Sequence, residues 1–468
     1  MSRDRKSLDL AVLLRNLGVA RTALWDNAEP IREELFGIDR LEDHARSLAH
    51  AQATAPGPAR GISLTARLRD NEIVLGHAFR TTIRACATGA AITPAAEWLC
   101  DNFHLVERQI REVRASLPPG FYRQLPKLVV GPFAGYPRVL GVAWAYVAHT
   151  DSRFDADVLV RFVRAYQQVQ PLGIGELWAV AITLRIVLIE NLRRFAVRIE
   201  DSQVARGNAD ALADRLLGID DGAPQRAATV LATRLREAVP DAFAVQFVHR
   251  LQDQSGDIAP ALTWLDDRLA ARGTSVYAAT RAEQERQVGA TVTVRNIITS
   301  MRLISEIDWL ELFERMSPVD DLLGSVGDYA AMDFATRNLY RTAIEDLARG
   351  APLSELEIAA AAVRAAGRSR RRDDARRSDP GYYLIAAGRA VLEAEIGYRP
   401  PVRDWPRRLS LALGIWGYGA FILGFALPIL LLPIAGLAGM GIGWAPLLVL
   451  ALLGATPTLD AAVGLVNA

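Results

Sequence analysis

The chain contains 468 residues, of which 51% are hydrophobic, and its 54 Lys and Arg residues nearly balance its 53 Asp and Glu residues. This length exceeds what one hydrophobic core usually supports and predicts two or three structural units. Because the net charge is close to zero, no overall field attracts a polyanion, and we expect no nucleic-acid partner. Cys86 and Cys100 are too few for a disulfide framework and lack the spacing of zinc ligands.

Residues 1–52 are predicted to form an N-terminal helical arm. They begin with the charged stretch MSRDRKSLDL, which lacks the apolar core of a signal peptide, so we expect the chain to begin in the cytosol. The stretch ATAPGPARG, Ala53 to Gly61, separates this arm from an α-helical cytosolic domain at residues 62–366. The domain shows no convincing pairs of strands and contains one predicted loop at Gly218 to Gln225, so the sequence predicts an all-α fold.

A clear helical seam lies early in this domain. The helix is predicted to begin after Thr93, where Pro94 suits the first helical position, and to end at LPPG, Leu117 to Gly120. Alternating steps of four and three residues place its apolar side chains on one face. These side chains are Leu99, Phe103, Val106, Ile110, Val113 and Leu117.

Three polar residues of the same helix raise the question of a functional face. Asn102 and Gln109 lie two turns apart beside the seam, and His104 lies on the opposite face. Polar groups on a helix mark a site only in some proteins. The simplest interpretation is a surface helix whose half-buried amides bond to neighbouring backbone.

The segment from Ile174 to Ile199 is apolar almost all round, which is typical of a central core helix. Its polar residues form one narrow line, comprising Glu176, Thr183, Glu190, Asn191 and Arg194. Arg185 lies alone on the opposite side, near Trp178. The uninterrupted apolar part of the segment is too short to span a bilayer, so we expect a buried core helix.

A charge-dense connector follows at residues 367–408, which we interpret as a charged linker and juxtamembrane helix. Its first part, GRSRRRDDARRSDPG from Gly367 to Gly381, is typical of a solvated linker. A second interpretation places its Arg residues against anionic lipid headgroups, at about 1 kcal/mol for each residue near the surface.

Residues 409–459 contain no Asp, Glu, Lys or Arg, and they predict a transmembrane hairpin. One transmembrane helix needs about 20 residues, so the stretch accommodates two spans. We place the first span at Leu409 to Ile434, the turn at Gly436 to Gly443, and a short second span at Trp444 to Ala455. The alternative is a buried helical hairpin in a soluble core.

The charge before the first span predicts its orientation. Arg399, Arg403, Arg407 and Arg408 precede the span, and positive residues favour the cytoplasmic side. The helical domain is therefore expected in the cytosol, and Ala468 returns to the same side after two spans. Candidate interfacial anchors are Trp405, Trp416, Tyr418 and Trp444.

The common catalytic motifs are missing from the sequence. DAD at Asp155 to Asp157 matches the metal-binding DxD of many sugar-nucleotide transferases, but an amphipathic helix follows it, which makes Asp155 or one of its neighbours a predicted helix cap. None of the nine Trp residues follows an Arg, so the QxxRW motif of processive glycosyltransferases is missing. We therefore expect no catalytic residue, cofactor or metal site in this chain.

Several long blocks, taken in order, resemble the N-terminal portion of bacterial cyclic β-1,2-glucan synthases, of glycosyltransferase family 84. The resemblance runs from about residue 40 to the end of the chain. The blocks are Trp98 to Leu128, Gly131 to Asp155, Gln170 to Arg194, Met301 to Leu323, Tyr329 to Ala348 and Asp379 to Pro401.

The resemblance implies a large enzyme of the bacterial inner (cytoplasmic) membrane that builds β-1,2-glucan from UDP-glucose on the cytosolic side. In the family, the glycosyltransferase domain follows the first membrane spans. UDP-glucose and a divalent metal are thus expected for that domain, which this chain lacks. The implied partners are the lipid bilayer, the glycosyltransferase domain of the same enzyme and β-1,2-glucan. We expect the chain to be inactive alone, as a fragment of the enzyme.

Eight polar or aromatic residues in these blocks are candidate contacts to glucan or to another domain. They are Asn102, His104, Gln109, Tyr136, Arg138, Glu176, Trp178 and Arg185. The simplest role for them is hydrogen bonding between helices, which makes the packing unique. The sharper hypothesis is a groove for the growing glucan, lined by Arg138, Glu176 and Arg185.

Two other functions remain open at this point. The first is an independent membrane-anchored helical scaffold that recruits other proteins, which a genuine stop codon after Ala468 in a complete gene would favour. The second is a helical glycosidase, which needs two carboxylates about 5–10 Å apart. Glu176 and Glu190 stand in apolar surroundings, but 14 positions separate them by about 21 Å along the helix, so we rank this function last.

Overall fold

The computed structural model describes residues 25, 27–55, 63–89, 92–117, 120–219, 239–252, 258–370, 376–401 and 405–467. Their regular secondary structure is almost entirely helical, which confirms the predicted all-α class. The strands described are β1 (Thr54–Ala55) and β2 (Lys127–Leu128), which pair antiparallel with Thr54 opposite Leu128. The chain divides into two compact units, unit 1 (Met1–Leu322) and unit 2 (Leu323–Ala468), so the division falls inside the predicted 62–366 domain.

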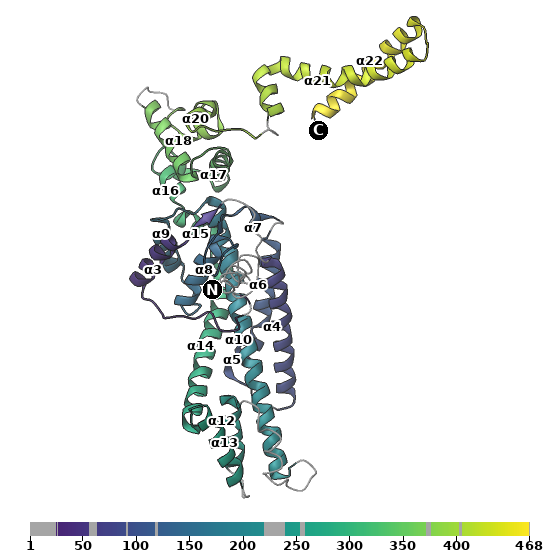
Figure 1. Cartoon of the computed structure of the whole chain (residues 1–468). Helices are drawn as coiled ribbons and strands as arrows, with labels where there is room; N and C mark the ends of the chain where they lie inside the picture. The colour runs from purple at the N-terminus through teal and green to yellow at the C-terminus, as the bar shows by residue number, and fades with distance from the viewer. Residues whose placement is uncertain are drawn as a thin grey trace, which may run out of the picture. The chain divides into compact units, whose positions relative to one another are not determined.

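The longest helix of unit 1 is α10 (Ile174–Leu217), which extends 18 residues beyond the predicted end at Ile199. Its 44 residues correspond to about 65 Å of helix. It packs against α4 (Leu64–Ala87), α8 (Arg138–His149), α12 (Asp241–Gln252) and α14 (Val276–Glu306), as Figure 1 shows. The sequence therefore predicted correctly that this segment is central.

Shorter helices complete unit 1. α3 packs on α9, α5 on α14, and α15 on both α9 and α10. Their bounds are α3 Ile38–Ala51, α5 Pro94–Asp101, α6 Phe103–Ala115, α7 Phe121–Gln124, α9 Ala156–Gln167, α13 Ala259–Ala271 and α15 Trp309–Met316, followed by α16 Pro318–Gly324 at the boundary with unit 2.

The predicted helix after Pro94 is interrupted once. Thr93 caps its start by accepting a hydrogen bond from the Ala96 N–H, as predicted. The helix breaks at Asn102, whose φ of −111° and ψ of 15° are not helical. The Asn102 side-chain amide donates to the Trp98 carbonyl at 2.9 Å, and an Asn that competes in this way for a backbone acceptor weakens a helix locally.

Unit 1 contains a separate apolar cluster at the C-terminal half of α10. Four helices, α10, α12, α13 and α14, contribute to it. Its largest members are Leu212, Phe243, Phe247, Leu251, Leu265 and Leu269. This cluster lies beyond the part of α10 that carries the polar line.

Unit 2 begins with a small helical bundle. Tyr340 donates a hydrogen bond of 2.8 Å to the Asp379 carboxylate, and Asp379 also caps the helix that follows it. A side chain at Gly381 would collide with the Tyr340 hydroxyl, so this close approach requires glycine. The elements are η2 Tyr329–Ala331, α17 Phe334–Ala348, α18 Glu355–Arg370, α19 Pro380–Ile385 and α20 Arg389–Glu395.

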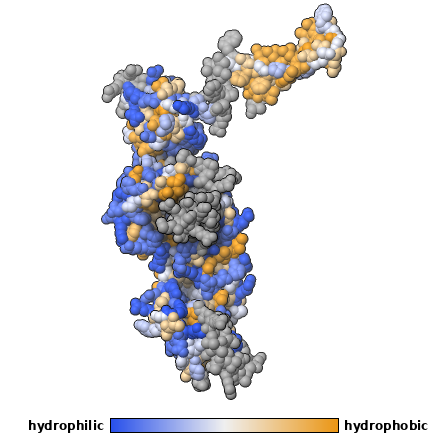
Figure 2. Space-filling view, viewed as in Figure 1, coloured by the Kyte–Doolittle hydropathy of each residue, from blue (hydrophilic) through white to orange (hydrophobic). Residues whose placement is uncertain are grey.

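The C-terminal part of unit 2 is a hairpin of two packed helices, α21 (Trp405–Gly439) and α22 (Trp444–Asn467). The stretches Gly417–Gly439 and Trp444–Val466 are long and apolar enough to cross a membrane, which confirms the predicted two-span hairpin. Only 6% and 11% of the most apolar stretch of each helix is buried, whereas a core helix of a soluble protein is mostly buried. Figure 2 shows hydrophobic residues over most of the hairpin surface in view.

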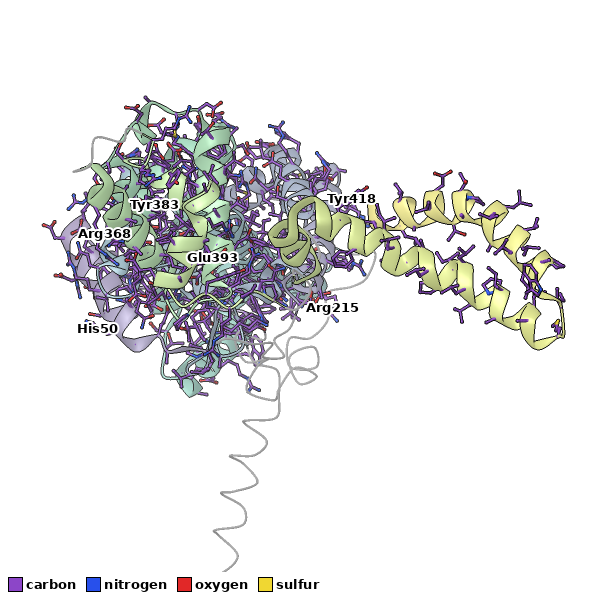
Figure 3. The ribbon with its side chains drawn as sticks, turned by 90° about the horizontal axis from the view of Figure 1, so that it is seen from above. His50, Arg215, Arg368, Tyr383, Glu393 and Tyr418 are labelled. Atoms are coloured by element: carbon purple, nitrogen blue, oxygen red, sulfur yellow. The ribbon has the colours of Figure 1, made fainter. Side chains whose placement is uncertain are left out.

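The predicted end of the second span at Ala455 is wrong. α22 continues through Pro457 and past Asp460 to Asn467, so the second span has 23 residues, the same number as the first. Apolar residues resume after Asp460, and an extended helix keeps their backbone groups hydrogen-bonded. Tyr418 lies near the start of the first span (Figure 3).

Some sequence predictions concern residues outside the described ranges. They include the arm before Trp25, most of the linkers at 53–61 and 218–225, and part of the connector at 367–381. Arg403 is not described, and neither are the side chains of Arg407 and Arg408.

Candidate functional site

The polar line predicted on the central helix is buried in unit 1. Each of its five residues is at most 2% exposed. Each also has a polar partner within hydrogen-bonding distance: Arg138 for Glu176, Tyr122 for Thr183, Arg67 for Glu190, Ser152 for Asn191 and Glu190 for Arg194. Satisfied buried polar groups of this kind fix one arrangement of the surrounding helices.

Arg138 and Glu176 form the first pair along this line. The Arg138 Nε donates to Glu176 Oε1 at 2.9 Å, and the same guanidinium donates to Gln170 Oε1 at 3.1 Å and to the Pro171 carbonyl at 3.0 Å. Burial opposes the charge on Arg138, but the hydrogen bond and charge of Glu176 prevail and raise the pKa of Arg138. The structure therefore brings these two candidate residues together inside the protein.

Glu190 lies between two buried arginines. Its carboxylate accepts hydrogen bonds of 2.9 Å from Arg67 on α4 and from Arg194 one helical turn further along α10. The outer nitrogens of these arginines donate to the backbone carbonyls of Trp25 and Glu29. Loss of hydration lowers the pKa of Arg194, a shift that the Glu190 carboxylate opposes. This cluster joins α4 and α10 to the segment before α3.

A second network joins the candidates Gln109 and Arg185. The Gln109 amide accepts from Arg185 Nε at 3.0 Å and donates to the Ser305 hydroxyl of α14 at 2.6 Å. Arg185 also lies over the Trp309 ring, 5.7 Å from its centroid. Burial lowers the pKa of Arg185, which the charge of Glu112 opposes. The predicted solitary Arg on the far side of α10 thus connects three helices.

The other candidate residues are distributed over unit 1. Tyr136 is buried, and its hydroxyl accepts from Trp25 Nε1 at 2.5 Å. Trp178 stacks on Phe313 with ring centroids 4.1 Å apart. Asn102 bonds to helix backbone, as the simplest interpretation predicted, and His104 is exposed. The structure does not gather these four residues at one place, and their role as glucan or inter-domain contacts stays a prediction.

An open cleft of about 760 Å³ lies elsewhere in unit 1, and we call it the α3–α14 cleft. One wall is the start of α3, a second is the turn between α8 and α9, and the third is a face of α14. The lining includes Phe36, Arg153, Phe154, Arg295 and Thr299. Ligand pockets in proteins usually measure about 300–1,000 Å³, so the cleft has the size of a binding site.

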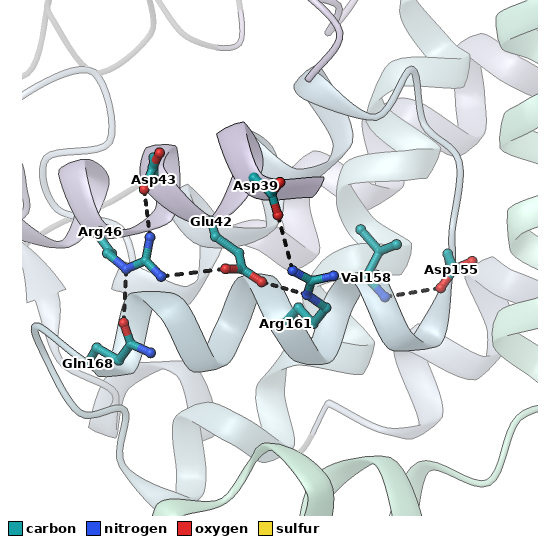
Figure 4. A network of polar contacts seen from close by, with 8 residues as sticks. All are labelled: Asp39, Glu42, Asp43, Arg46, Asp155, Val158, Arg161 and Gln168. Carbon is teal, nitrogen blue, oxygen red and sulfur yellow. Dashed lines mark hydrogen bonds and ion pairs between the residues drawn. The ribbon is translucent and has the colours of Figure 1, made fainter. Parts of the chain in front are cut away.

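Ion pairs fix the α3 wall of this cleft against α9. Figure 4 shows Arg46 in contact with Glu42, Asp43 and Gln168, and Arg161 in contact with Asp39 and Glu42. Asp155 accepts from the N–H groups of Asp157 and Val158 at 3.0 Å, so this Asp of the DAD stretch caps α9 as predicted.

The floor of the cleft contains an unusual turn. Asp151 and Ser152 have φ values of 50° and 61°, in the left-handed region that residues other than glycine rarely adopt. Asp151 accepts from the Thr293 hydroxyl at 2.6 Å and from the Asn296 amide at 3.1 Å. Ser300 donates to the Ser152 carbonyl at 2.7 Å. Strained backbone held by so many contacts is typical of ligand-binding sites.

His149 lines the cleft and contacts a second histidine, His44. His149 stacks on Phe36 with centroids 4.0 Å apart, and His44 meets His149 edge-on at 4.4 Å. The His149 Nε2 lies 3.2 Å from a carboxylate oxygen of Glu33. Burial, and then the charge of His149, lower the pKa of His44. His44 is therefore neutral at neutral pH.

Sequence reasoning missed the cleft as a site. Its three walls come from segments far apart in the chain, and periodicity relates only residues of one element. The available signal was the stretch HTDSRFD, which places two small polar residues directly after an apolar helix. Among the described residues, no group of three or more His, Cys, Asp or Glu side chains is arranged to hold a metal ion.

The fold and these sites define a helical protein with an extensive buried polar framework and a hairpin suited to a membrane. No protein-family model matches the chain. Over 446 residues, or 94% of its length, the chain is 37% identical to the protein named Cyclic beta-(1,2)-glucan synthase NdvB of Rhizobium meliloti (strain 1021). The chain spans 16% of the length of that protein. It is thus related to a portion of a cyclic glucan synthase, which confirms the resemblance seen in the sequence.

Proposed function

We propose that this chain is the N-terminal helical and membrane-anchoring module of a cyclic β-1,2-glucan synthase, and that another part of such an enzyme transfers glucose from UDP-glucose. The observation that carries the proposal is the 37% identity over 94% of the chain, which corresponds to 16% of the relative. The buried networks on α10 suit a module that holds its shape while other domains act.

The hairpin supplies the anchor in this proposal. Leu432 and Leu453 are 72% and 73% exposed, and a bilayer would cover such side chains. Arg399, Arg407 and Arg408 lie on the N-terminal side of the first span, and by the positive-inside rule this supports a cytosolic position for unit 1. We therefore propose the bacterial inner membrane as the location, with the glycosyltransferase domain and the bilayer as partners.

A chimera tests this function. The matching portion of the Rhizobium meliloti relative is replaced by this chain, and membranes are incubated with labelled UDP-glucose. We expect the chimera to make labelled cyclic glucan and the same enzyme without the portion to make none. A chimera that carries Leu432→Arg and Leu453→Arg serves as the control for anchoring and should lose membrane-bound activity.

Membranes that contain only this chain give the complementary result. We expect no label in glucan or on the chain, because the transfer step belongs to another part of the enzyme. Label incorporated by the chain alone, or full activity of the relative without its matching portion, would overturn the proposal.

A further inference from the structure

We propose that the α3–α14 cleft binds a β-1,2-linked glucose oligomer. The inference rests on the proposed function, because a glucan synthase makes this ligand. The residues of the cleft indicate where the ligand would bind. The residues that carry it were not among those singled out in the sequence, apart from Asp155.

The polar groups of the cleft suit sugar hydroxyls. Among the described residues, the guanidinium groups of Arg153 and Arg295 have no ion-pair partner, and both line the cleft. Arg295 lies over the Trp98 ring at 5.9 Å, a contact that leaves its N–H groups available. A guanidinium presents several donors in one plane, which matches two neighbouring hydroxyls of a sugar ring.

The walls of the cleft offer apolar surface for the C–H faces of the sugar rings. Four aliphatic residues around it are 41–54% exposed: Leu35, Ile38, Val292 and Leu303. Binding sites for small molecules combine apolar walls with a few fixed polar groups, and this cleft has both.

The charge of the lining favours a neutral ligand. The carboxylates of Asp151 and Asp155 stand in the same lining as the guanidinium groups of Arg153 and Arg295, and Asp151 also pairs with Arg32 at 3.3 Å. Carboxylates repel the phosphates of a nucleoside diphosphate, whereas they accept hydrogen bonds from sugar hydroxyls. A glucose oligomer is uncharged and rich in hydroxyls.

The strained turn supplies the rigidity that such a site needs. Asp151 is anchored to α14, and Asn191 of α10 donates to the Ser152 hydroxyl at 2.9 Å. Arg153 follows directly and is therefore presented from a fixed backbone. A preorganised donor binds more tightly because less freedom is lost on binding.

Titration of the full chain in detergent with linear β-1,2-glucan oligomers tests the proposal. Calorimetry should show saturable binding, and α-1,4-linked glucose oligomers of equal length should bind more weakly. The double variant Arg153→Ala and Arg295→Ala should lose about tenfold or more in affinity. Arg281→Ala is the matched control. Arg281 is an exposed arginine of α14, the helix that carries Arg295, and it pairs with Glu285 outside the cleft.

The outcomes separate this proposal from the function on which it rests. Circular dichroism checks that each variant keeps its helical content. No saturable binding, equal binding of both linkages, or unchanged affinity of the double variant would each overturn the cleft assignment. Preferential binding of UDP would do the same. The proposed function is tested separately, by the chimera and by the membranes that contain only this chain, and none of these binding results decides it.

Discussion

Arg138 at the start of α8 and Glu176 in the first turn of α10 form a charge pair that is almost fully inside the protein, with side-chain exposures of 8% and 1%. The carboxylate also accepts the Gly173 N–H at 2.9 Å, so one group ties α8 to the N-terminus of α10. Removing one charge leaves the other buried and unpaired.

We therefore predict that Glu176→Gln lowers the free energy of unfolding by about 3–5 kcal/mol, the usual cost of breaking a buried ion pair. Urea titration of the full chain in detergent, followed by circular dichroism, measures this change. Glu285→Gln is the control, because Glu285 pairs with Arg281 on an exposed helix face and should matter far less. Equal effects of the two substitutions would refute the structural role of the pair.

A second prediction concerns the left-handed turn. Asp151→Ala removes the contacts to Thr293 and Asn296 and places alanine at a φ of 50°, so we expect a loss of at least about 2 kcal/mol. Asp151→Asn should cost less, because asparagine tolerates this conformation and keeps an acceptor. The same urea titration compares them. Equal losses for the two variants would show that the charge of Asp151, which pairs with Arg32 and is removed in both, governs this position rather than the backbone.

The third prediction concerns the hairpin. Leu432→Arg and Leu453→Arg each place a charge on an exposed apolar side of a span, at a cost of about 2.5–3.5 kcal/mol per residue near the centre of a membrane helix. Flotation of vesicles on a density gradient should find less of the double variant in the membrane fraction. Val204→Arg, an exposed change in unit 1, should float like the unaltered chain. If the double variant floats normally, these helices do not form the anchor.

His44 gives a prediction for pH. Burial and His149 hold its pKa in the folded protein below the ordinary value of 6.5. As pH falls below 6.5, the unfolded chain takes up the proton first, so the stability contributed by neutral His44 is lost toward acid. His149 and Glu33 face it, and Phe36 packs beside it.

The measurement is the thermal midpoint of the full chain in detergent between pH 5 and pH 7.5. We expect the midpoint to fall toward acid, and His44→Phe to flatten this decline while keeping an aromatic contact with His149. Parallel curves for the two proteins would show that His44 does not contribute.

The sequence predicted the interior of unit 1 well where the pattern within a single helix was enough to show which residues are buried. The line from Glu176 to Arg194 follows from helical periodicity alone, and it is buried as expected. The hydrogen-bonding partners of these residues could not be predicted because they lie far away in the chain. Arg67 is 123 residues from Glu190, and Gln109 is 76 residues from Arg185. Only tertiary packing brings such pairs together.

The errors have local causes. The break at Asn102 arises because a side-chain amide competes for the backbone of a helix whose apolar pattern continues without interruption. The second span was predicted too short, and α22 includes both Pro457 and Asp460 beyond the predicted end. The exposure of the cleft residues depends on how three separate segments pack together. A sequence pattern within one segment cannot predict this packing.

The apolar cluster around Leu212 and Phe247 shares α10 and α14 with the rest of unit 1 but sits at the far end of α10. We therefore expect the two regions to open partly independently of each other. Amide hydrogen exchange should thus be faster in α12 and α13 than in the first half of α10. The buried charged residues of unit 1 would then stay protected from exchange while the end of the unit that contains α12 and α13 opens locally.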